Sequence, residues 1–392
     1  MRTLGLLLAT ACAAAAAEHT LDLSGEWRFA LDCGDTGVAE SWFSRELDST
    51  AALPGSLTVQ RLGYPVTVDT KWIGGIVDKS YFTDAGYEPY RRPGNVKVPF
   101  WLQPETYYAG AAWYQRDIEI PADWKGRRTV LSLERPHWET RVWIDGRCIG
   151  TNNALATPHD YDLGLLPPGK HVLTIRVDNR MIVDVGENSH SVSDHTQGNW
   201  NGVVGRIELR STPPVWIDDV QVVPDAARKT ARVRVTAKAA GSVGIEGGEA
   251  GGVRCQVSVR RENGDGATHR MAIDLKWAED VGTGAGELSL GPDAALWDEF
   301  APNLYELTAT LSPAAGSAPL PAPDSRLLRF GIRDFTVQGT QFAINGRPVS
   351  IRGTLDCCIF PKTGHPPTDV AEWKRIIRSE ERRVGKECRS RW

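Results

Sequence analysis

Residues 140–150 read TRVWIDGRCIG, and this stretch decides the fold class of the first half of the chain. Apolar and polar side chains alternate through residues 140–144, as in a strand with one buried face. Asp145-Gly146 follows and favours a two-residue type I′ turn, because both central positions of that turn need a positive φ. The stretch therefore predicts a β-hairpin.

The same alternation recurs on both sides of this hairpin, between residues 21 and 214. It predicts further strands at residues 26–31, 113–120, 127–133, 171–177 and 206–209. No helical pattern interrupts them, and Pro167-Pro168-Gly169 separates two of them as a turn does. Short strands divided by turn residues predict a β-sandwich of the jelly-roll kind, which we assign to residues 18–214.

A second all-β block follows Pro213-Pro214. Its predicted strands are residues 215–223, 230–238, 253–260, 269–274 and 304–311. We expect a turn at Asn263-Gly264 and a flexible glycine-rich loop at residues 241–252, which lacks the ending of a phosphate-binding loop. The block has the size of an immunoglobulin-like sandwich, assigned to residues 215–333.

A third block changes character, because a hairpin around Asn345-Gly346 is followed by a helix signal at Thr368. Four apolar residues after Thr368 share one helical face: Val370, Trp373, Ile376 and Ile377. A strand and helix after two all-β domains predict the start of a (β/α)8 barrel, which we assign to residues 334–377.

Both ends of the chain are set apart from these domains. Residues 1–17 combine Arg2, an apolar run and small residues, which predicts a secretory signal peptide and a periplasmic or extracellular protein. A buried N-terminal helix and lipoprotein anchoring through Cys12 are the alternatives. The run is too short to predict a membrane span. Residues 378–392 (RSEERRVGKECRSRW) resemble a translated sequencing adapter and are expected to be non-native, with a solvated helix end as the alternative.

Composition excludes several classes of protein. The chain has 45 Lys and Arg against 49 Asp and Glu, and no basic block before its last residues, so we expect no nucleic-acid partner. Seven cysteines occur without a Cys-x-x-Cys motif, and no cofactor or metal site is predicted. Cys148 and Cys255 are predicted to be buried structural thiols.

Five short motifs occur along the chain: LSGEWRF (23–29), VWIDG (142–146), GNWNG (198–202), LWDEFAPNLY (296–305) and INGRPV (344–349). In this order they resemble glycoside hydrolase family 2, the β-galactosidase, β-glucuronidase and β-mannosidase group, from residue 21 to residue 377. The resemblance implies an exported retaining β-glycosidase, with a β-linked carbohydrate as substrate and a candidate homo-oligomer as the full-length protein.

The resemblance also implies two catalytic glutamates on later barrel strands, one of them in an Asn-Glu pair. The sequence contains no Asn-Glu dipeptide. Glu134 was weighed as a substitute and is better explained as a surface charge. We therefore predict no catalytic residue in this chain, which is expected to be an inactive N-terminal fragment.

Three residues are candidate substrate contacts: Trp200, Asp356 and His365. Trp200 lies in the GNWNG motif, although most tryptophans are core anchors. Asp356 falls where the first barrel strand would end, and it and His365 could equally make structural hydrogen bonds. The nearest acid before Trp200 is Asp194. Aromatic residues 81–108 could border a sugar cleft or form a packing lid.

Two other functions stay open at this point. One is a stand-alone secreted carbohydrate-binding, adhesion or scaffold protein that uses the sandwiches alone. The other is an assembly module, which would form a defined oligomer without binding sugar. An unpartnered strand and helix with an apolar face argue for the glycosidase.

Overall fold

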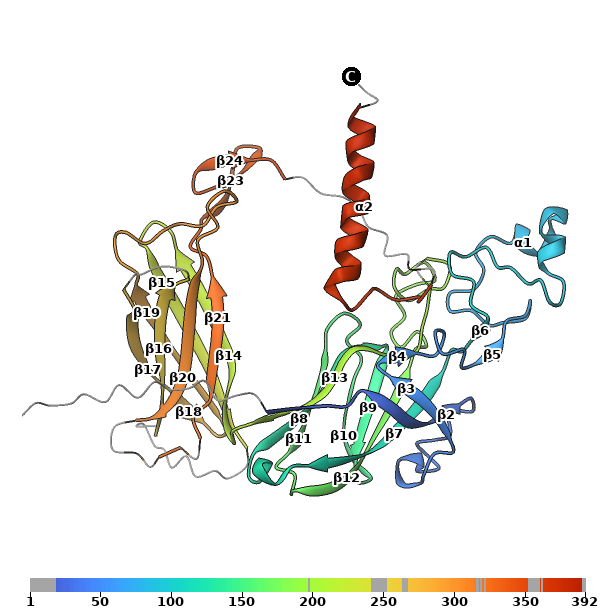
Figure 1. Ribbon diagram of the computed structural model, residues 1–392, viewed down its shortest axis with the longest axis horizontal. Helices are drawn as coiled ribbons and strands as arrows, with labels where there is room; N and C mark the ends of the chain where they lie inside the picture. The colour runs from blue at the N-terminus through green and yellow to red at the C-terminus, as the bar shows by residue number, and fades with distance from the viewer. Residues whose placement is uncertain are drawn as a thin grey trace, which may run out of the picture.

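The computed structural model describes residues 19–389, apart from residues 197, 241–251, 263–266, 315–316, 318, 321, 352–359 and 361. Two bodies built of strands stand side by side, one from β1 to β13 and the other from β14 to β21 (Figure 1). The predicted signal peptide, the Asn263-Gly264 turn, nearly all of the glycine-rich loop and Asp356 lie outside the described residues.

The first body is a sandwich of two antiparallel sheets. The larger sheet has the order β10-β9-β12-β7-β2-β3: β10 (Arg147–Asn152), β9 (Glu139–Ile144), β12 (Gly169–Asp178), β7 (Ala111–Ile120), β2 (Gly25–Asp32) and β3 (Ser49–Leu53). The other sheet joins β1 (His19–Asp22), β13 (Gly202–Thr212), β8 (Arg128–His137) and β11 (His159–Gly164), with β4 (Gly55–Ser56) also on β13. The predicted all-β sandwich is confirmed.

The hairpin of β9 and β10 has the expected turn. Asp145 and Gly146 have φ values of 51° and 78°, and Ile144 pairs with Arg147 across them. Positive φ at both positions is the type I′ geometry that matches strand twist. Cys148 in β10 is exposed, so the prediction that it is buried was wrong. The strand lies at the edge of its sheet, where no neighbouring strand covers it.

Apolar side chains from both sheets fill the space between them, including Trp27, Tyr114 and Leu133. Trp113 and Trp143 are equally buried but belong to a separate cluster, with their rings 5.0 Å apart. Strand alternation explains the difference, because successive residues face opposite sides of a sheet. The prediction that Trp27, Trp113 and Trp143 are core residues is confirmed.

A long insertion separates β4 from β7. It contains the one-turn helix α1 (Ser80–Thr83), the 3-10 helix η2 (Ala85–Tyr90) and the paired strands β5 (Tyr64–Pro65) and β6 (Thr106–Tyr107). Its small core is made of Trp72, Ile76, Tyr81, Val98, Phe100 and Tyr107. Two further 3-10 turns, η1 (Trp42–Ser44) and η3 (Ala122–Trp124), lie elsewhere in the sandwich. Much of the aromatic segment 81–108 therefore packs on itself.

The second body is also a two-sheet sandwich. One sheet has the order β14 (Val215–Asp225), β15 (Thr230–Ala239), β19 (Val281–Ser289) and β18 (Lys276–Ala278). The other has the order β17 (His269–Asp274), β16 (Val253–Arg261), β20 (Tyr305–Pro313) and β21 (Ser325–Phe330). Cys255 is fully buried between them, as predicted.

The two bodies meet where β13 leads into β14. The Arg128 guanidinium lies 3.9 Å from the Trp216 ring centroid, a cation–π contact. Nearby, the Ile217 N–H donates to the buried Asp324 carboxylate at 2.8 Å.

The third part begins with a small sheet of β22 (Phe335–Gln338), β23 (Gln341–Ile344) and β24 (Arg347–Val349). The predicted Asn345-Gly346 turn is present, with φ values of 50° and 78°. Helix α2 (Val370–Arg389) begins where predicted and projects away from the first sandwich in Figure 1. It continues through residues 378–389, which belong to the tail that we expected to be non-native. Val370 and Ile377 on its apolar face are 68% and 54% exposed.

Among the described residues, no helix combines the length and the apolar character needed to cross a membrane.

Candidate substrate-binding site

The pairing of β8 with β13 places the candidate site. His137 ends β8 and lies opposite Gly202, the first residue of β13. Trp200 stands just before β13, so the register brings it beside His137. Both residues lie at the end of the sandwich, where His137 is buried and Trp200 is partly exposed.

Three aromatic rings follow one another at this rim. The His137 and Trp200 ring centroids are 5.0 Å apart, and those of Trp200 and His365 are 5.2 Å apart. Trp200 and His365 were predicted separately from the sequence, and the structure brings them into contact. Sequence analysis missed His137, since only the strand register connects it with Trp200.

Burial favours the neutral form of both histidines. It lowers the pKa of His137 to about 4, and it also lowers the pKa of His365. The His137 Nε2 atom is buried and has no hydrogen-bond partner in the described structure. Neutral imidazoles offer flat rings and one donor each, which suits ring stacking better than binding of an anion.

Two buried asparagines fix the loop that carries Trp200. Asn199 donates to the carbonyl oxygens of Asn179 and Val192 at 3.0 and 2.9 Å. Asn201 donates to the carbonyl oxygen of Gly110 at 2.9 Å. The side chains of both asparagines are therefore used to hold the backbone, and Trp200 between them is only partly buried.

Asp194 supports this loop from below. Its side chain is buried and accepts from Tyr107 Oη at 2.5 Å, from Ile73 N at 2.8 Å and from Asn199 N at 3.0 Å. Burial raises the pKa of Asp194 to about 7 despite these bonds. The carboxyl group thus joins the insertion to the Trp200 loop.

Leu102 of the insertion fills the space between the Trp200 and His365 segments. A Cβ added at Gly198 would lie 3.2 Å from Leu102 Cδ2, and one added at Gly364 would lie 3.1 Å from the same atom. Arg135 closes the other side by donating to the Pro367 carbonyl oxygen at 3.1 Å. The segment around His365 is therefore held on the first sandwich by both apolar and polar contacts.

Glu134 is not available as a catalytic acid. Its carboxylate accepts from the Arg206 backbone N–H at 3.0 Å and from Arg206 Nε at 3.1 Å. Burial alone would raise the pKa of Glu134, but these hydrogen bonds outweigh it and the pKa is lowered. Its ion pair with Arg206 agrees with the interpretation of Glu134 as a surface charge.

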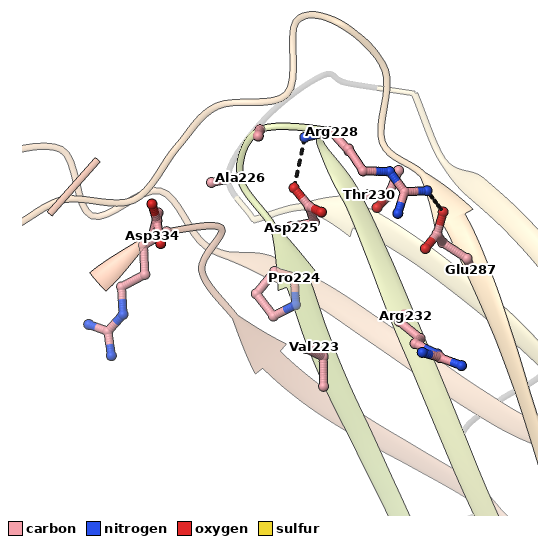
Figure 2. Close-up of a pocket in the computed structure, with 11 residues that line it drawn as sticks. Val223, Pro224, Asp225, Ala226, Arg228, Thr230, Arg232, Glu287 and Asp334 are labelled. Atoms are coloured by element: carbon pink, nitrogen blue, oxygen red, sulfur yellow. Dashed lines mark hydrogen bonds and ion pairs between the residues drawn. The ribbon is translucent and has the colours of Figure 1, made fainter. Parts of the chain in front are cut away.

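Other hollows lie away from these rings. A pocket of about 450 Å³ opens where the second sandwich leads toward β22, lined in part by Arg228, Glu287 and Asp334 (Figure 2). The Arg228 guanidinium forms an ion pair with Glu287 there, and the Arg228 backbone N–H donates to the Asp225 carboxylate at 2.8 Å. Within the described part of the chain, no cluster of three or more His, Cys, Asp or Glu side chains could hold a metal ion.

Comparison with known proteins finds a family match for the second sandwich. Residues 215–333 match the model of the glycosyl hydrolases family 2.

The second sandwich is therefore similar to a domain of the glycosyl hydrolases family 2.

Curated relatives of the chain include the β-galactosidase of Aeromonas hydrophila subsp. hydrophila, 26% identical over 89% of the chain and 32% of the relative. The β-glucuronidase of Paenibacillus borealis is 22% identical over 85% of the chain and 48% of its own length. The chain thus spans a third to a half of these relatives.

Solved structures share the fold. The β-glucuronidase of Bacteroides uniformis has a TM-score of 0.62 at 18% identity, covering 92% of the chain and 38% of that protein. That of Bifidobacterium dentium, solved with coumarin-3-O-glucuronide, has a TM-score of 0.58 at 21% identity, covering 86% and 51%.

Proposed function

We propose that the whole protein is a retaining β-glycosidase, and that the rings of His137, Trp200 and His365 form one wall of its substrate site. The contact between Trp200 and His365 carries this proposal. It joins a loop of the first sandwich to the segment that the family resemblance assigns to the start of the catalytic barrel.

The wall has the chemistry of a sugar site. A tryptophan face can stack on the apolar face of a pyranose ring, and its N–H can donate to a hydroxyl. The buried His137 ring packs against Trp200 and helps to hold it in place. The buried Asn199 and Asn201 bonds hold Trp200 before a ligand arrives, which reduces the entropy lost on binding.

Hydrolysis itself needs two carboxyl groups that this wall does not supply. In a retaining mechanism one acts as acid and then base, and the other attacks the anomeric carbon about 5–5.5 Å away. Glu134 is committed to Arg206, and Asp194 to the Trp200 loop. We therefore assign the catalytic pair to the remaining length of the whole protein, and expect residues 18–377 alone to be inactive.

Export is part of the same proposal. Arg2, the apolar run and the small residues before Glu18 support a cleaved signal peptide. Mass spectrometry of the mature N-terminus in a periplasmic or culture fraction tests this. A mature chain that begins at Met1 in the cytoplasm would contradict it.

The activity is tested by assaying the whole protein against p-nitrophenyl β-galactoside, β-glucuronide and their α-anomers. We expect one β-anomer to be hydrolysed, and the chain ending at Ile377 to hydrolyse none. Trp200→Ala is expected to raise KM more than it lowers kcat, because it removes part of the ring wall. If the whole protein hydrolyses none of the β-glycosides, the proposed activity is wrong. A carbohydrate-binding or scaffold function would then be the better explanation.

A further inference from the structure

Trp101 differs from the other tryptophans of the protein. Its surface is 65% exposed, whereas the remaining tryptophans that the structure describes are buried or partly buried. Exposing a side chain of this size gives up a large part of its hydrophobic contribution to folding. Such a residue therefore needs a reason that folding does not provide.

The exposure is not the result of a loose segment. Phe100 and Leu102 on either side of Trp101 are only 9% and 7% exposed. Gln103 holds the turn: its Nε2 donates to the carbonyl oxygens of Val98 and Phe100 at 2.6 and 2.8 Å, and its Oε1 accepts from Val98 N at 3.0 Å. The backbone thus presents Trp101 outward from a fixed position.

The turn lies at the candidate site. Leu102, the next residue, fills the space between the Trp200 loop and the His365 segment, as its contacts with Gly198 and Gly364 show. The Phe100 ring on the other side lies 6.5 Å from that of His195, which follows Asp194. Trp101 is therefore anchored on both sides to the elements that form the ring wall.

We propose that Trp101 is a specificity-determining residue that stacks on the part of a β-glycoside beyond the sugar being hydrolysed. This inference rests on the proposed function. The three-ring wall is partly enclosed, so it suits the sugar that enters the site. An exposed ring on the turn that packs against the wall's elements suits a second sugar ring or another flat leaving group, which stays in contact with solvent.

The test uses the whole protein and two substrates of the sugar that it hydrolyses: the methyl β-glycoside, which has no second ring, and a β-linked disaccharide. For Trp101→Ala we expect the ratio of kcat/KM for the disaccharide to that for the methyl glycoside to fall roughly three- to tenfold. Trp101→Phe keeps a flat ring and should recover part of this ratio.

Phe300→Ala is the matched control, because Phe300 is 80% exposed but lies in the second sandwich. It should leave the ratio unchanged. An unchanged ratio in Trp101→Ala, with wild-type activity on both substrates, would overturn the role of Trp101 and leave the proposed function intact. An equal loss on both substrates would also overturn it. Failure of the wild type to hydrolyse either substrate would instead overturn the proposed function, and this inference with it.

Discussion

Gly202 shows how closely the backbone is packed beside Trp200. Its φ is +142°, and a Cβ at this position would lie 2.2 Å from the carbonyl oxygen of Gly55 in β4. Glycine is required there for two separate reasons, conformation and space. The residue that starts β13 therefore also sets the position of Trp200.

Substitution of Gly202 by alanine should be costly for both reasons. Gly169 is the control, since its φ of +123° is similar but a Cβ there would meet nothing within 4 Å. Gly169→Ala should cost only strain, about 1–3 kcal/mol. Gly202→Ala should cost about 1–3 kcal/mol more through the clash with β4. Equal free energies of unfolding for the two variants, measured by urea denaturation, would refute this account of Gly202.

Cys255 should be chemically silent in the folded protein. Burial raises the pKa of its thiol to about 11, so little thiolate forms at pH 8. Cys33 and Cys148 are exposed. Peptide mapping after a short alkylation at pH 8 should find both of these labelled, and Cys255 labelled at least about tenfold more slowly until denaturant is added. Comparable labelling of all three would contradict the buried position of Cys255.

At the scale of elements, sequence patterns identified strands whose buried face carries branched or aromatic residues, such as β7, β12 and β15. They missed β19, which has glycine at 282, 284 and 286. These glycines make room for neighbouring side chains: a Cβ at Gly284 would lie 2.6 Å from Ile273 Cγ2 in β17. Only the paired structure reveals that need, because β17 and β19 belong to different sheets.

The candidate site, like the strands, could be predicted from the sequence only in part. Trp200 lies in a local motif that sequence analysis can find, and His365 lies in the segment assigned to the start of the barrel. Their contact with each other, and with His137 and Leu102, depends on strand register and on the docking of the insertion. Cys148 was misjudged because alternation cannot distinguish an edge strand from a central one.

The contribution of Asp194 to the stability of the folded protein should depend on pH. Its folded-state pKa of about 7 lies above the usual value of a carboxyl group, so folding favours the protonated form. The stability that this proton contributes is full below about pH 4 and is lost as the pH rises through 7.

The difference in unfolding free energy between wild type and Asp194→Asn should therefore decrease by up to about 4 kcal/mol from pH 4 to pH 8. Denaturation of both proteins across this range measures it, and Asp219→Asn, an exposed carboxylate of the second sandwich, is the control. A difference that stays constant would show that the pKa of Asp194 is not shifted by folding, and one that grows with pH would show that folding lowers it. Either result would contradict this account.

At the scale of the whole molecule, two sandwiches and a short third part account for the described chain, and its relatives extend to two or three times this length. The first sandwich and the segment around His365 carry the ring wall, and the second sandwich lies between β13 and β22 along the chain. We propose that the wall helps to shape a substrate site whose carboxyl groups we assign to the rest of the protein.

The central claim is that the whole protein hydrolyses β-glycosides with retention. It is tested most directly by following hydrolysis of its preferred aryl β-glycoside by ¹H NMR and identifying the anomer of the sugar released first. We predict that the β-anomer appears first and then mutarotates to the equilibrium mixture. Initial release of the α-anomer, or no hydrolysis of any β-glycoside, would contradict the claim.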